Sequence, residues 1–493
     1  MLEASRSALA RRPVADSSDH RAALLATAVA SLAAWALTRD WIAAAGLFVL
    51  WAGWHWLRTA EGSPVLRLAF TFQWIQVTAG MYYYGLSGRR LPAMDWSDYR
   101  PMVLIGLGCL VAVLAGLRLG MATARWWPAD DRPRPERALG WRSLVTIYAV
   151  LLAVTGPVQA LAWEVPELTQ AILALTYFRV AVLFMMFWQL IRLPAGWCGI
   201  VLLLAVEVAF GFTGYFAGFR EPLMMAAVAL VSIFDSRRVK HWLVLGVLLA
   251  TMLGTGLMWL SVRTGYREDF ESDVFAASRL ARAERFIDLS STWMRSSSPR
   301  EFVDDLDFFV ERLWAVYYPA LAVTRVPAVL PYEDGNLLWR AITDTFLPRL
   351  LFPDKGTLPS DSDMVIRYSG VWVAGAEQNT SIAFGYAAES YVDFGVPLMF
   401  LPIFAWAVLL GIGYQALLRL IRHRDLAVAV VTVIFWLSLY LFERSWAKNL
   451  GTFATLVVYL GGATIAADRM LLRFRLRRAS PALRGARASP TLS

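Results

Sequence analysis

Apolar segments recur along almost the whole chain, and this recurrence limits the fold more than any other feature of the sequence. About 20 apolar residues in a helix cross the roughly 30 Å hydrocarbon core of a bilayer. Backbone polar groups in lipid must be satisfied within the segment, so each run is expected to be helical. We expect about twelve transmembrane helices, at residues 22–38, 41–57, 65–84, 101–117, 143–162, 168–191, 197–214, 222–235, 242–261, 397–418, 426–442 and 450–467.

The composition agrees with a membrane protein and excludes a soluble multidomain protein. Of 493 residues, 58% are hydrophobic and only 17% are charged. The two cysteines, Cys109 and Cys198, lie in or beside predicted spans and predict neither a disulfide framework nor a metal site. The first apolar run follows a polar tail and precedes a second span, which is not the pattern of a cleavable signal.

The basic residues predict the orientation of the chain. With the N-terminus inside, most of them fall in cytoplasmic connectors, as the positive-inside rule requires, and only Arg89, Arg90 and Arg100 oppose it. Both termini are therefore expected in the cytoplasm. The formal net charge of +9 then reflects topology, and a nucleic-acid partner is not expected, because the charges form short clusters at segment ends.

These observations divide the chain into five parts. A cytoplasmic tail (1–21) precedes nine transmembrane helices (22–261), an extracytoplasmic loop with amphipathic helices (262–396), three further transmembrane helices (397–467) and a basic cytoplasmic tail (468–493). No repeat relates the two halves, which argues against transporters built from matched halves.

The long loop contains local helix signals. Ser298, Pro299 and Glu301 have the spacing of a capping box with proline at the first helical position. An apolar stripe at helical spacing follows them, so we expect an amphipathic helix on the bilayer surface or packed on the spans. From 327 to 370 we expect irregular backbone with short helices.

Three arginines near predicted spans are candidates for binding an anion. Arg220 lies in a tight outward turn, where its alternative role is to pair with Glu221. Arg263 and Arg267 follow the ninth span, and a helix continuing outward would place both on one face. Two neighbouring guanidinium groups suit a diphosphate, although anchoring to lipid headgroups explains them equally.

Two other charged pairs lie in the long loop. Arg349 and Lys355 belong to a proline-bounded segment, which physics alone describes as a rigid loop. Glu389 and Asp393 are four residues apart and are able to share a helical face. Partial burial would raise one carboxyl pKa toward the range of a general base, whereas the alternative is an ordinary helix terminus.

Four stretches together resemble Wzy-type oligosaccharide repeat-unit polymerases, the O-antigen and exopolysaccharide polymerase family. They are GFREP (218–222), LPYEDG (330–335), FLPRLLFPDKG (346–356) and TSIAFGYAAESYVDFG (380–395). The resemblance covers about residues 210–410, and the first third of the chain matches only as generic spans.

The resemblance implies an all-α integral membrane glycosyltransferase of the GT-C type in the bacterial cytoplasmic (inner) membrane. Such enzymes transfer a growing chain from polyprenyl diphosphate to an incoming lipid-linked repeat unit at the outer face. The resemblance assigns Arg220, Arg349 and Lys355 to the leaving diphosphate, without a metal or other cofactor, and Arg444 is a weaker candidate. Expected partners are polyprenyl-diphosphate-linked oligosaccharides and membrane lipids, with a chain-length regulator and a flippase as further candidates.

The positions of the histidines distinguish a repeat-unit polymerase from the related O-antigen ligases. O-antigen ligases are expected to use an outward-loop histidine, but His20, His241 and His423 fall on the predicted inner side and His55 lies low in the second span. A base would then be a carboxylate, Glu389 first and Asp393 second. A dissociative transition state with a well-stabilised diphosphate needs no strong base.

Several alternatives remain open from the sequence. They are an O-antigen ligase or other GT-C glycosyltransferase, a lipid-linked sugar flippase or transporter, and a structural subunit of an envelope complex. A transporter predicts ionisable residues at mid-depth, and Arg179 and Glu207 meet that description. A structural ion pair across two spans is the simpler account of these two residues.

Overall fold

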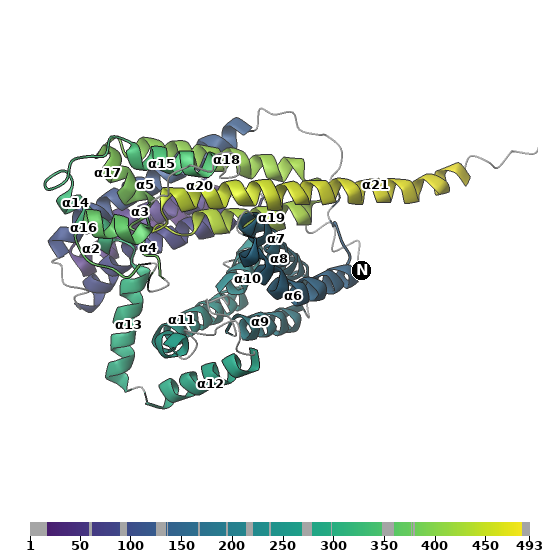
Figure 1. The fold of residues 1–493 in the computed structure, drawn as a ribbon, viewed down its shortest axis with the longest axis horizontal. Helices are drawn as coiled ribbons and strands as arrows, with labels where there is room; N and C mark the ends of the chain where they lie inside the picture. Colours follow the sequence, from purple (N-terminus) through teal and green to yellow (C-terminus); the bar gives the residue numbers. More distant parts are fainter. Residues whose placement is uncertain are drawn as a thin grey trace, which may run out of the picture.

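The computed structural model describes residues 17–58, 62–88, 96–124, 135, 137–165, 168–193, 196–212, 220–235, 238–268, 279–296, 298–347, 359–375, 377 and 380–485. Within these residues every regular element is a helix (Figure 1). The helices before the long loop are α2 (Ser17–Thr38), α3 (Trp41–Trp56), α4 (Val65–Ser87), α5 (Trp96–Thr123), α6 (Trp141–Glu164), α7 (Thr169–Thr176), α8 (Phe178–Leu190), α9 (Gly196–Phe212), α10 (Arg220–Ile233) and α11 (Val239–Glu268).

Six helical segments of the described chain are long and apolar enough to cross a membrane. They are Tyr99–Thr123, Trp141–Gln159, Thr169–Leu190, Val239–Arg263, Phe400–Leu420 and Trp446–Arg473. Each of the twelve predicted spans coincides with a helix or with consecutive helices. The all-helical multi-pass class is thus supported, and the number of twelve crossings stays a prediction.

The long loop folds into short helices, as its sequence predicts. They are α12 (Arg279–Ser296), α13 (Pro299–Leu313), α14 (Tyr317–Arg325), α15 (Asn336–Phe346), α16 (Asp361–Ser369) and α17 (Gly385–Phe394). The predicted capping box is confirmed: Ser298 Oγ accepts from the Glu301 amide at 3.3 Å, and Glu301 Oε2 accepts from the Ser298 amide at 2.6 Å. α11 continues to Glu268, so the expected loop start at 262 lies inside this helix.

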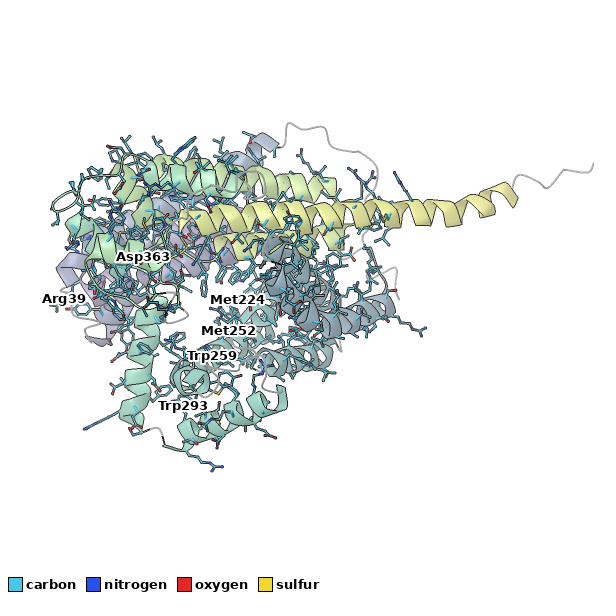
Figure 2. All side chains as sticks on the ribbon, viewed as in Figure 1. Arg39, Met224, Met252, Trp259, Trp293 and Asp363 are labelled. Atoms are coloured by element: carbon cyan, nitrogen blue, oxygen red, sulfur yellow. The ribbon has the colours of Figure 1, made fainter. Side chains whose placement is uncertain are left out.

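α12 runs beside the second half of α11. The ring centroids of Trp259 on α11 (labelled in Figure 2) and Phe286 on α12 lie 6.3 Å apart, and Tyr266 is in ring contact with both. α13 then leads back toward the main bundle, where Tyr83 of α4 donates a hydrogen bond to Asp307 at 2.5 Å. The loop helices therefore pack on the bundle through specific contacts.

The last helices are α18 (Phe400–Leu420), α19 (Arg424–Leu439), α20 (Trp446–Thr455), the π-helix η3 (Leu456–Gly461) and α21 (Gly462–Gly485). α19 is the central helix of the bundle, because every residue from Asp425 to Leu439 is buried. α5 and α18 pack with their backbones unusually close. A Cβ on Gly120 would lie 2.1 Å from the Val408 carbonyl oxygen, so only glycine allows this approach.

The connectors predicted to face the cytoplasm meet at one end of the bundle, which we call the tail end. There the Ala138 amide donates to Asp425 at 2.8 Å, and Asp468 accepts from the Arg422 amide at 2.8 Å. Asp468 also lies 2.6 Å from Nδ1 of His423, and both side chains are fully buried. α21 extends away from this end (Figure 1).

The connectors predicted to face outward meet at the opposite end, which we call the loop end and which carries α14, α16 and α17 (Figure 1). The Trp314 ring nitrogen donates to the Val77 carbonyl at 2.9 Å, and the Ala315 amide donates to the Gln76 carbonyl at 3.0 Å. The end of α13 is thus attached to α4. The orientation of the two ends relative to a bilayer stays a prediction.

Candidate functional site

Two glutamines one turn apart on α4 hold the turn that joins α19 to α20 (residues 440–445). Gln73 donates to the Leu439 carbonyl, and Gln76 donates to the Tyr440 carbonyl at 2.9 Å. The Gln76 side-chain oxygen accepts from the Phe442 amide at 2.8 Å. The last carbonyl groups of a helix have no intrahelical partner, so these bonds satisfy the end of α19 and fix the turn.

The N-terminus of α17 packs against the same turn. The Tyr386 amide donates to the Arg444 carbonyl at 2.8 Å, and the Tyr386 hydroxyl donates to Gln73 at 2.9 Å. Gly385 has φ +92°, and a Cβ there would lie 2.6 Å from the Phe442 carbonyl oxygen. Both the backbone conformation and the close approach therefore require glycine at this position.

Charged side chains from three distant parts of the chain surround Glu443 in this turn. Burial raises the pKa of the Glu443 carboxyl, and Arg312, Arg220, Arg444 and Lys448 oppose that rise. Arg220 begins α10, and Arg312 lies in the last turn of α13. We call Arg220, Arg312, Arg444 and Glu443, which are linked by this electrostatic interaction, the arginine cluster.

The Arg444 side chain is fixed in the cluster. Its guanidinium donates to the Leu437 carbonyl, and its Cζ lies 5.5 Å from the ring centroid of Tyr440. Burial lowers the pKa of Arg444, whereas Tyr440, Tyr177 and Glu443 favour its charged form. Tyr177 lies between α7 and α8, and its phenol acts on the Arg444 guanidinium.

Lys448 is committed to a neighbouring pair. Its ammonium lies 2.5 Å from Asp361 and donates to Ser381 at 2.9 Å. Glu221 follows Arg220 and acts on Tyr177 and Tyr440 together with arginines of the cluster, so three arginines and two carboxylates carry a formal charge of +1. Such a site suits a dianion with several oxygens, because each guanidinium is able to bind two of them.

The two predicted catalytic carboxylates lie at helix N-termini. Glu389 is 6% exposed and accepts from the Trp446 amide, the first of α20, at 2.9 Å. Asp393 is 1% exposed and accepts from the Leu337 and Leu338 amides of α15 at 3.0 and 2.8 Å. Burial raises the pKa of Glu389 to about 8 and that of Asp393 to about 6. Both side chains thus occupy helix-capping positions.

The other predicted residues divide into two groups. Arg263 lies on α11 with its Cζ 6.0 Å from the ring centroid of Phe308 on α13. Arg267 is on the same continuous helix, as the expected spacing requires, but only its backbone is described. Arg349 and Lys355 lie outside the described residues. Arg220 and Arg444 therefore both act on Glu443, whereas the contact given for Arg263 is with Phe308 of α13.

Sequence reasoning missed Arg312 and Glu443. Arg312 lies on the predicted amphipathic helix, where it reads as one of several solvated charges. Glu443 directly precedes Arg444 in a predicted outward turn. The available signal was the adjacency of Glu443 and Arg444 in an outward turn, and it does not point to Arg312.

A separate charged group lies among α6, α8 and α9. Arg179 pairs with Glu207, whose side chain is 2% exposed, and the Tyr148 hydroxyl donates to Glu207 at 2.6 Å. This confirms the ion pair across two spans that the sequence predicted. No group of three or more histidine, cysteine or acidic side chains in the described chain is arranged as metal ligands.

No protein-family model, no curated protein and no solved structure matches this chain.

Proposed function

We propose that this chain is a membrane glycosyltransferase of the GT-C type. It polymerises polyprenyl-diphosphate-linked oligosaccharide repeat units at the outer face of the bacterial cytoplasmic membrane. The observation that carries the proposal is the assembly of Arg220, Arg312 and Arg444 around Glu443 at one end of a helical membrane bundle. The resemblance of residues 346–356 and 380–395 to repeat-unit polymerases supports the choice of substrate.

In this proposal the arginine cluster binds the diphosphate of the donor. An acceptor hydroxyl oxygen forms a bond to the anomeric carbon, and the bond from that carbon to the diphosphate oxygen breaks. The bonding electrons leave with the diphosphate, where the arginines neutralise the developing charge. Electrostatic stabilisation of this kind is often the largest contribution to catalysis.

We assign Glu443 as the base that takes the proton from the acceptor hydroxyl. The arginines act on its carboxylate, and burial raises its pKa toward the value that suits a base at neutral pH. In the competing assignment Glu389 or Asp393 is the base. Their hydrogen bonds to α20 and α15 favour a supporting role, in which they hold those helices in place.

The test is polymerisation by the purified chain in liposomes that contain lipid-diphosphate-linked repeat units. Arg444→Ala should slow chain growth about 30- to 1,000-fold, which corresponds to a loss of roughly 2–4 kcal/mol of transition-state stabilisation. Arg58→Ala removes a charge at the far end of α3 and should leave the rate unchanged. Equal rates for wild type and Arg444→Ala would remove the cluster from the proposed role.

Two further readouts separate the alternatives. Arg349→Ala tests the resemblance independently of the cluster, and cells with this variant should accumulate lipid-linked single units. Transfer of a finished chain to a different acceptor, without chain growth, would identify a ligase instead of a polymerase. Movement of intact lipid-linked units between leaflets, with no new glycosidic bond, would identify a flippase.

A further inference from the structure

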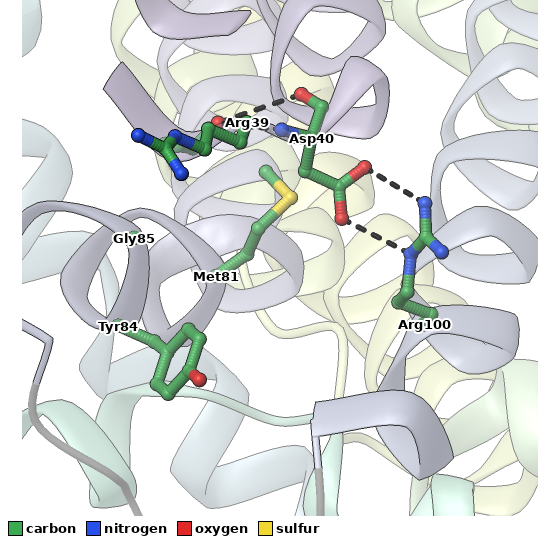
Figure 3. A pocket seen from close by; sticks show the side chains of 7 residues that line it. Arg39, Asp40, Met81, Tyr84, Gly85 and Arg100 are labelled. Atoms are coloured by element: carbon green, nitrogen blue, oxygen red, sulfur yellow. Dashed lines mark hydrogen bonds and ion pairs between the residues drawn. The ribbon is translucent and has the colours of Figure 1, made fainter. Parts of the chain in front are cut away.

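A second charged site lies at the loop end, separate from the arginine cluster. It is a cavity of about 240 Å³ between the α2–α3 turn, the C-terminal part of α4 and the start of α5 (Figure 3). Its lining includes Thr38, Arg39, Asp40, Met81, Tyr84 and Arg100. A volume of this size suits a small headgroup, because sites for drug-sized ligands are typically about 300–1,000 Å³.

Asp40 is held by the N-terminus of α3 and by Arg100. Its Oδ1 accepts from the Ile42 amide at 3.0 Å and from Arg100 Nη2 at 3.1 Å, and its Oδ2 lies 3.0 Å from Arg100 Nε. This carboxylate therefore caps α3 and orients Arg100. Nη1 of Arg100 and the whole guanidinium of Arg39 have no partner among the described side chains and backbone.

The backbone of Arg39 is unusual for an arginine. Its amide donates to the Trp35 carbonyl at 2.8 Å and ends α2, with φ at 55°. This left-handed conformation favours glycine or asparagine, and other residues adopt it at some cost. Turn geometry alone does not account for arginine here. The two arginines and Asp40 give the lining a formal charge of +1.

Exposed apolar side chains lie on the same helices as the charged cavity, within a few residues of its lining. Trp35 and Leu37 on α2 are 53% and 65% exposed, and Trp41 on α3 and Leu86 on α4 are 54% and 64% exposed. Tryptophan is enriched where headgroups meet acyl chains. An unpartnered cation next to exposed tryptophan and leucine is the arrangement expected for a lipid with a charged headgroup.

We propose that this cavity binds the phosphate headgroup of an anionic membrane phospholipid. The Arg39 side chain, which points away from Arg100 in Figure 3, turns on binding so that it and Nη1 of Arg100 contact the phosphate oxygens, and the acyl chains lie along Trp35, Leu37 and Leu86. A free phosphate ester shares the headgroup chemistry but cannot make the apolar contacts. The proposal concerns a site apart from the arginine cluster and does not depend on the glycosyltransferase assignment.

The experiment is native mass spectrometry of the full-length protein in detergent, titrated with phosphatidylglycerol or phosphatidylcholine. Wild type should retain phosphatidylglycerol preferentially. Arg39→Asn keeps a residue that tolerates the left-handed backbone and removes the charge, so the preference should fall about tenfold. Arg39→Lys should keep most of the preference. Arg58→Asn, at the opposite end of α3, should not change it.

Several outcomes would overturn the proposal. One is an unchanged lipid preference in Arg39→Asn, and another is an equal loss in Arg58→Asn. Displacement of the lipid by equimolar glycerol phosphate would show a site for a free phosphate ester. Should Arg39→Asn not yield monodisperse protein, Arg39→Gly is the second neutral variant, because glycine adopts this backbone without strain.

Discussion

The carboxylate of Glu389 accepts a hydrogen bond from the backbone amide of Trp446 at 2.9 Å, and the Trp446 ring donates to Ser390 at 2.9 Å. One turn of α17 therefore holds the first residue of α20 by two contacts. Trp446 immediately follows the 440–445 turn that carries Glu443 and Arg444. The position of Glu443 and Arg444 therefore depends on the buried side chain of Glu389, which holds the end of their turn.

The raised pKa of Glu389 predicts that the free energy of unfolding falls as the pH rises. Its pKa is about 8 when folded, against an ordinary value of 4.5. Below about 4.5 both states hold the proton, and between the two values only the folded state retains it. Stability should then fall by up to about 1.4 kcal/mol per pH unit until about pH 8. The thermal midpoint of wild type should therefore fall relative to that of Glu389→Gln as the pH rises from 5 to 8.5.

The same variant tests the competing catalytic assignment. Glutamine keeps an acceptor oxygen for the Trp446 amide but cannot act as a base. If Glu389 only supports α20, Glu389→Gln should polymerise near the wild-type rate at neutral pH, whereas Glu443→Gln should be slow. Midpoints that run parallel at every pH would contradict the stability prediction, and a slow Glu389→Gln would restore Glu389 as the base.

The hydrogen bonds of Asp393 predict a loss of stability when its side chain is removed. Asp393→Ala leaves the buried amides of Leu337 and Leu338 without their acceptor and should cost about 1–3 kcal/mol. Asp393→Asn keeps one acceptor oxygen and should cost about half as much. Asp288 is 64% exposed in a surface ion pair, so Asp288→Ala is the matched control and should shift the thermal midpoint little.

Arg312 was not a sequence prediction, and its variant tests the cluster most directly. Arg312→Gln should slow polymerisation about ten- to 150-fold, from the roughly 1.5–3 kcal/mol of a charge-assisted hydrogen bond. Arg300 is exposed in the first turn of the same helix, so Arg300→Gln is the control and should keep the wild-type rate. Equal effects of the two substitutions would show that the charge of α13, and not its position, is what matters.

The Arg179–Glu207 pair predicts non-additive effects on stability. Glu207→Leu leaves the part-buried guanidinium of Arg179 without its acid and should cost up to about 3–5 kcal/mol, the loss expected for a broken buried pair. The double variant with Arg179→Leu should recover most of this loss, apart from about 1 kcal/mol for the unpaired Tyr148 hydroxyl. The measurement is the thermal midpoint of each purified variant. A folded double variant that has lost all activity would show that the pair has a functional role.

The sequence predicts the features that depend on local signals. The capping-box spacing predicts the start of α13 from Ser298, Pro299 and Glu301. Hydropathy predicts a helix at every expected span. The ion pair between Arg179 and Glu207 follows from the high cost of isolated charge in lipid. In each case the relevant partners are close in sequence or are restricted by the bilayer.

The site depends on contacts that no local pattern contains. Glu389 and Asp393 looked like reactive acids because they share a helical face, yet each bonds to amides more than fifty residues away. Arg312 reaches Glu443 only because α13 packs on α4. Tertiary packing determined these partners, and hydrophobic periodicity does not encode them.

Gln76 has a mechanical consequence for the cluster. Its backbone carbonyl accepts a hydrogen bond from the Ala315 amide, just after α13. Its side chain bonds to Tyr440 and Phe442 in the turn before α20. Gln76 therefore ties the segments that carry Arg312 and Arg444 to a single residue of α4. In the proposed polymerase, the distance between these two arginines would select ligands by the spacing of their negative oxygens as well as by total charge.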